Sequence, residues 1–60
     1  GIVTREEIGQ AVGILMERHR LSARQAFDAM IYVSQNTHRK LRDIARWVTE
    51  AGENPNSLLS

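Results

Sequence analysis

The chain has 60 residues, a formal net charge of +1 and no cysteine. This length allows one small domain, and the lack of cysteine excludes disulfides and thiolate metal sites. No run approaches the roughly 20 apolar residues that span a bilayer, and no signal-peptide pattern opens the chain. We therefore expect a cytoplasmic protein without a membrane partner.

Positive charge is concentrated in the middle of the sequence. Residues 1–17 carry a net charge of −2, residues 18–46 carry +5 and residues 47–60 carry −2. Six of the seven cations in the middle segment are arginines. This asymmetry is compatible with a nucleic-acid surface, and equally with the solvated basic face of an ordinary helical domain.

The first helix is predicted from a start signal and an apolar repeat. Thr4 and Glu7 have the spacing of a capping box, which predicts a helix that begins near Arg5. Apolar residues then recur at helical spacing at Ile8, Ala11, Val12, Leu15 and Met16.

A second helix follows a short break at residues 19–21. Ser22 and Gln25 form another capping-box pattern. The expected core stripe of this helix consists of Ala23, Ala26, Phe27, Met30 and Ser34, flanked by Ile31 and Val33.

Cap-type residues at 36–39 separate the second helix from a third. The third helix carries Leu41, Ile44, Ala45 and Val48 on one face, and Gly52 stands where a left-handed C-terminal cap is expected. Residues 53–60 are polar and are interpreted as a tail that frays or leads elsewhere. No segment alternates with a period of two, so we predict an all-α, compact three-helix bundle over residues 1–52.

Gly13 is unusual inside the first helix, because an interior glycine costs about 1 kcal/mol relative to alanine. On a helical wheel Gly9 and Gly13 lie outside the apolar arc, and Ile14 falls on the polar side. These three residues predict a bare face that a second subunit or a nucleic-acid backbone approaches closely. A merely tolerated surface glycine is the alternative.

The third helix carries a stripe of arginines, Arg39, Arg42 and Arg46, spaced to contact successive phosphates or a guanine edge. Lys40 lies on the other flank beside Trp47. Ordinary helix pairing, Arg39 with Asp43 and Arg46 with Glu50, is the competing explanation for these charges. Trp47 is expected at the edge of the core, and Tyr32 is the better candidate for an exposed aromatic side chain.

Catalytic and metal-binding patterns are missing from the sequence. His19 falls on the apolar arc and is expected at the core edge, whereas His38 is expected to be exposed. Neither has a partner at metal-ligand spacing, and no nucleophile has a base and an orienting group. We expect no enzyme, no cofactor and no metal.

The segments "IGQAVGILMERHRLSARQAF" and "SQNTHRKLRDIA" together resemble the ANTAR domain, the RNA-binding output module of bacterial transcription-antitermination regulators. The resemblance covers residues 5 to 50. It implies a three-helix bundle that follows a sensory domain, for example the phosphoryl-receiving domain of a two-component system, and dimerises through a coiled coil. It implies binding to paired stem-loops with hexanucleotide loops in nascent mRNA, so that a terminator hairpin does not form. Asn is common in the family where His38 stands. The start at "GIVTREE" fits a fragment of such a regulator or a stand-alone version.

On this interpretation the chain is a homodimer in its full context and binds RNA. The residues predicted to contact RNA are Gly13, Arg18, Asn36, Arg39, Lys40, Arg42 and Arg46. Gly9, Gly13 and Ile14 are predicted to form a dimer or close-approach face. The alternatives are a helix-turn-helix DNA reader that uses the third helix, and a helical protein-interaction module.

Overall fold

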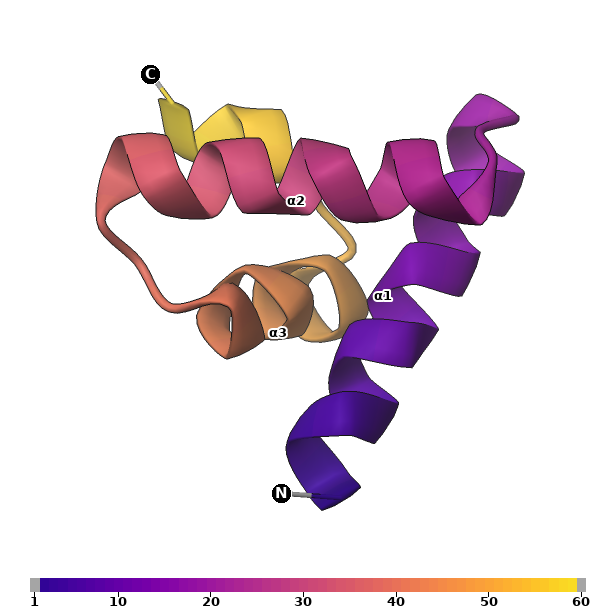
Figure 1. Cartoon of the computed structure of the whole chain (residues 1–60), viewed down its shortest axis with the longest axis horizontal. Coiled ribbons are helices and arrows are strands. Elements are labelled where there is room, and N and C mark those ends of the chain that lie inside the picture. The colour runs from indigo at the N-terminus through magenta and orange to yellow at the C-terminus, as the bar shows by residue number, and fades with distance from the viewer. Residues whose placement is uncertain (1, 60) are drawn as a thin grey trace.

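The computed structural model describes residues 2–59 and confirms the all-α, three-helix bundle. Helix α1 spans Ile2–His19, α2 spans Ala23–Thr37 and α3 spans Leu41–Ala51, and a 3-10 helix, η1, follows at Pro55–Leu59. No strand occurs within these residues. In Figure 1, α1 runs obliquely past α3, while α2 passes over α3 and has η1 beside it.

The core is small and is built from all three long helices. Among the residues that the structure describes, the core consists of eight buried residues: Ala11, Leu15, Ala26, Met30, Val33, Ile44, Ala45 and Val48. Helices α1 and α3 share the most extensive packing, and each contributes a fully buried alanine, Ala11 on α1 and Ala45 on α3. Each helix thus contributes one apolar stripe, as the periodicity predicts.

The buried face of α2 is rotated relative to the prediction. Ala23 is exposed and Phe27 is 38% exposed, whereas Val33, expected only at the flank, is fully buried. The cause is η1, which packs against α2 near Ala29. Covering that side of α2 moves the centre of burial away from Phe27.

The helix boundaries follow two of the predicted signals and contradict a third. At α2, Ser22 Oγ accepts from the Gln25 N–H at 3.1 Å and the Gln25 side chain accepts from the Ser22 N–H at 2.9 Å, a complete capping box. Gly52 ends α3 with a φ of +69°, as predicted. The start of α1 near Arg5 is wrong, because the helix already includes residues 2–4. A capping-box pattern marks the start of a helix only where the residues before it are not themselves helical.

The end of the chain is folded, so the expectation that it frays is wrong for residues 55–59. Pro55 is buried, and Leu58 packs against the core cluster. Asn54 Oδ1 accepts a hydrogen bond from Arg18 Nη1 at 2.8 Å and lies 3.0 Å from His19 Nε2. His19 is therefore exposed and held by this segment, not placed at the core edge as predicted. The domain boundary at residue 52 stays a prediction.

Candidate nucleic-acid interface

The connection between α2 and α3 is held by its own backbone. The N–H groups of His38 and Arg39 both bond to the Ser34 carbonyl oxygen, the latter at 3.2 Å, and Ser34 Oγ donates to the Arg39 carbonyl oxygen. His38 closes the helix in the left-handed conformation, with a φ of 56°. These bonds fix the chain direction at Arg39 while its side chain stays exposed.

Three cations project from this connection and the first turn of α3. Arg39, Lys40 and Arg42 are exposed, and within residues 2–59 none of their side chains has a hydrogen-bond or ion-pair partner. We call these three residues the basic junction. Because nothing in the described chain neutralises them, their full charge faces solvent and is available to an anionic partner.

Arg46 differs from the basic junction in having acidic partners. Its Nε lies 3.3 Å from Glu7 Oε2 on α1 and 3.8 Å from Glu50 Oε1 on α3. The hydrogen bond to Glu7 and the charges of both glutamates raise the pKa of Arg46 above its ordinary value. The predicted Arg46–Glu50 pair is thus confirmed. Of the predicted arginine stripe, Arg46 is paired with acidic residues, whereas Arg39 and Arg42 are not paired within the part of the chain that the structure describes.

The predicted pair between Arg39 and Asp43 is not formed among the described residues. An i, i+4 pair requires both residues on one helix, and α3 begins only at Leu41. Asp43 instead lies in the first turn of α3, where a carboxylate interacts favourably with the helix dipole. Both Arg39 and Asp43 therefore keep their polar ends available.

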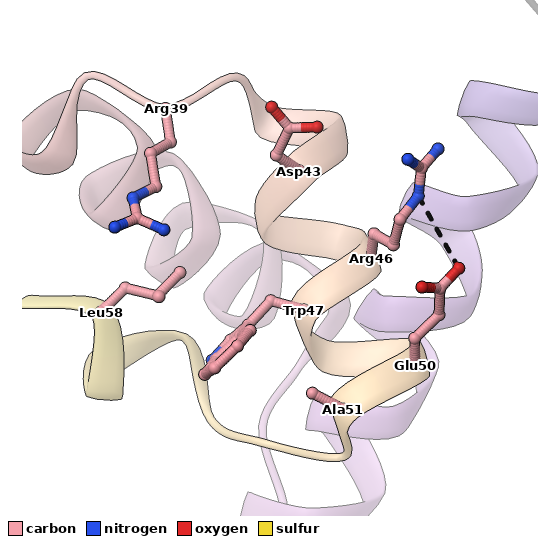
Figure 2. A pocket seen from close by; sticks show the side chains of 7 residues that line it. All are labelled: Arg39, Asp43, Arg46, Trp47, Glu50, Ala51 and Leu58. Atoms are coloured by element: carbon pink, nitrogen blue, oxygen red, sulfur yellow. Dashed lines mark ion pairs between the residues drawn. The ribbon is translucent and has the colours of Figure 1, made fainter.

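A hollow of about 280 Å³ opens beside the basic junction, between α3 and η1 (Figure 2). Its lining consists of Arg39, Asp43, Arg46, Trp47, Glu50, Ala51 and Leu58. Trp47 Nε1 donates to Ser57 Oγ at 3.0 Å, and the ring is partly buried, which agrees with its predicted place at the core edge. The sequence reasoning missed the hollow, because Leu58 belongs to the segment interpreted as a tail. The available signal was the spacing of Pro55 and Leu58, because residues three positions apart lie on one face of a 3-10 helix.

Two further residues predicted to contact RNA, Asn36 and Arg18, lie outside the hollow. Asn36 is exposed next to the junction, and its side-chain amide donates to the Tyr32 carbonyl oxygen at 2.8 Å. Arg18 lies in the last turn of α1, near the start of α2, and is bonded to Asn54. Helix α2, about 22 Å long, has the end of α1 near its start and leads into the basic junction at its end (Figure 1). Tyr32 is 58% exposed, as expected.

The glycine edge of α1 is open, and part of the predicted face is corrected. Gly9 and Gly13 are exposed, and a Cβ added at either would meet no atom within 4 Å. No segment of the described chain therefore requires these glycines for close packing. Ile14, by contrast, is partly buried and packs against the core cluster, so its expected place on the polar side is wrong, while its contact with a second subunit stays a prediction.

The sequence was compared with models of known protein families. The family model of the ANTAR domain matches residues 2–48, and the chain belongs to this family. ANTAR domains are RNA-binding output domains of regulators that control transcription antitermination. Neither the comparison with curated proteins nor that with solved structures gave a match.

Two further observations bear on the chemistry that this chain can perform. Within residues 2–59, no group of three or more His, Cys, Asp or Glu side chains is arranged to hold a metal ion. None of the described helices combines the length and the apolar character needed to cross a membrane. The family itself is regulatory and binds RNA, with no enzymatic role known for it.

Proposed function

We propose that the chain binds paired stem-loops with hexanucleotide loops in nascent mRNA, as a homodimer in its full context, and thereby prevents a terminator hairpin from forming. The observation that carries the proposal is the basic junction, since Arg39, Lys40 and Arg42 are three exposed cations without acidic partners in a family that binds RNA. Loop bases are accessible to side chains, unlike bases inside an A-form duplex.

Of the remaining predicted contacts, Asn36 adjoins the junction and Arg46 lies one turn along α3 from Arg42. We assign them supporting roles, because the side chain of each already has a partner within the chain. Arg18 and Gly13 lie on α1. In this proposal Arg18 contacts RNA that extends past the bundle, and Gly13 contacts either that RNA or a second subunit.

A gel-shift assay tests the proposal with an RNA of two hexaloop stem-loops, its loop-scrambled counterpart and a DNA duplex of equal length. We expect retention of the stem-loop RNA and weaker retention of the other two. Arg39→Ala, Lys40→Ala and Arg42→Ala should each weaken binding. Arg24→Ala is the matched control, because Arg24 is an exposed arginine on α2 that pairs with Asp28. Equal retention of scrambled RNA would refute loop recognition, and a preference for the duplex would favour the DNA-reading alternative.

Dimerisation is tested separately by sedimentation of the 60-residue chain over a range of concentrations. In a second protein, a dimerising coiled coil is added at the N-terminus to hold two copies together. RNA that carries two stem-loops should then bind more tightly than RNA that carries one, because the second contact becomes intramolecular. Gly13→Leu tests the open edge of α1, since a Cβ at this position has open space around it. If Gly13→Leu leaves both dimerisation and RNA binding intact, this edge contacts neither partner.

A further inference from the structure

Three groups of different chemistry line the hollow between α3 and η1. Arg39, Asp43 and Trp47 line one open space, and Leu58 lines the same space (Figure 2). These residues supply a cation, a carboxylate and an aromatic ring. Leu58 lies in η1, outside the part of the chain that the family model matches.

The indole ring of Trp47 lines the hollow. Its N–H already donates to Ser57 Oγ at 3.0 Å, so the polar end of the side chain is satisfied. The same bond restricts rotation of the ring between α3 and η1. A fixed aromatic ring at the edge of a basic surface is the arrangement on which unpaired bases stack.

The two charged groups without partners add directional recognition. Asp43 accepts hydrogen bonds only, and no donor side chain in residues 2–59 bonds to it. Arg39 offers donors only and likewise has no side-chain partner there. An occupant with an amino group, a flat apolar face and a nearby anion matches all three groups, and a nucleotide has this combination.

We propose that the hollow binds one unpaired base of the RNA loop. The base stacks on Trp47, its exocyclic amino group donates to Asp43, and the adjacent phosphate pairs with Arg39. Cytosine, guanine and adenine carry such an amino group, whereas uracil offers a carboxylate only its single N3–H, which lies between two carbonyl oxygens. The hollow therefore favours the three amino-bearing bases over uracil. This inference rests on the proposed RNA-binding function and assigns it a base-reading site.

Trp47 is the sole tryptophan of the chain, so its fluorescence reports directly on the hollow. The experiment titrates the 60-residue chain with CMP, GMP, AMP, UMP and ribose 5-phosphate, and uses free N-acetyltryptophanamide to correct for collisional quenching. We expect saturable quenching by the three amino-bearing nucleotides, at least about fivefold tighter than by UMP. Ribose 5-phosphate should leave the emission unchanged.

Asp43→Asn should reduce the preference over UMP to less than about twofold, because the amide replaces one acceptor oxygen with a donor. Asp28→Asn is the matched control on α2, outside the hollow, and should leave the preference unchanged. Circular dichroism checks that both variants keep the helical content of the parent chain. Quenching that does not saturate, or a preference that survives in Asp43→Asn, overturns the inference.

A parallel gel shift with the two-stem-loop RNA separates the two proposals. If the RNA binds but Asp43→Asn binds every loop variant as the parent chain does, the base site is wrong and the RNA-binding function stands. If the mononucleotides bind saturably but the stem-loop RNA is not retained, the proposed function fails and the hollow remains a nucleotide site.

Discussion

The basic junction makes a quantitative prediction about salt. Each phosphate neutralised by a cation releases condensed counterions, and the slope of log K against log salt changes by about 0.7 to 0.9 per contact. Three free cations, Arg39, Lys40 and Arg42, therefore predict a slope of about −2 to −3 for one protomer. A fourfold increase in salt should then weaken binding about 20- to 40-fold. A dimer on two stem-loops should show about twice this slope.

The assay is fluorescence anisotropy of labelled stem-loop RNA at several salt concentrations. Each of Arg39→Ala, Lys40→Ala and Arg42→Ala should reduce the magnitude of the slope by about 0.7 to 0.9 per protomer. Arg46→Ala should reduce it less, because Glu7 and Glu50 already neutralise Arg46 within the chain. The reasoning is refuted if the triple variant keeps the parent slope, or if Arg46→Ala changes it as much as Arg42→Ala does.

Three predictions concern the fold that presents this surface. Met30→Ala should lower the free energy of unfolding by about 2–5 kcal/mol in urea denaturation, because Met30 is fully buried; a loss below 1 kcal/mol would mean that the core collapses around the gap. His38→Gly should raise the thermal midpoint by about 4–8 °C by removing about 1 kcal/mol of left-handed strain, whereas His38→Ala should give no gain. Asn54→Ala should speed hydrogen exchange in η1, since it removes the contacts with Arg18 and His19; unchanged exchange would show that apolar packing alone holds η1.

The parts of the fold that the sequence predicts are those with local causes. The capping box at Ser22 and the left-handed cap at Gly52 each depend on residues within four positions, so their patterns identify them reliably. The core positions Leu15 and Ile44 follow from helical periodicity, which is equally local. The arrangement of the three helices as a bundle is also implied by the family resemblance, which depends on two separate segments of the sequence and not on one local pattern.

The errors have a common physical origin in contacts between distant segments. The exposed Phe27 and the folded η1 are two consequences of one packing event, since η1 covers the other side of α2. No periodicity within α2 contains that information. Residues 36 and 37 were expected to interrupt the helix, but α2 includes both. Their side chains donate to carbonyl oxygens four residues earlier, Thr37 Oγ1 to that of Val33 at 2.7 Å, and so do not cap the next helix.

The sequence predicts the cations of the candidate site but not the hollow beside them. Arg39 and Arg42 were identified by spacing alone, although the stripe that they formed with Arg46 depended on a helix that begins two residues too late to include Arg39. The pairing of Arg46 with Glu7 joins residues 39 positions apart, which no spacing rule reaches. Charge patterning thus identifies which cations exist, and only the tertiary structure decides which of them remain free.

Affinity and base preference should therefore be separable in this molecule. Phosphate contacts position an RNA without reading its sequence, whereas contacts to base edges specify it. Lys40 lies in the basic junction and does not line the hollow, so Lys40→Ala should change the salt slope and leave the base preference intact. Asp43→Asn should do the reverse, because it alters a base acceptor and removes no phosphate contact. Arg39 lines the hollow as well as belonging to the basic junction, but its assigned contact is to a phosphate. Arg39→Ala should therefore change the salt slope, as Lys40→Ala does, and leave the base preference intact.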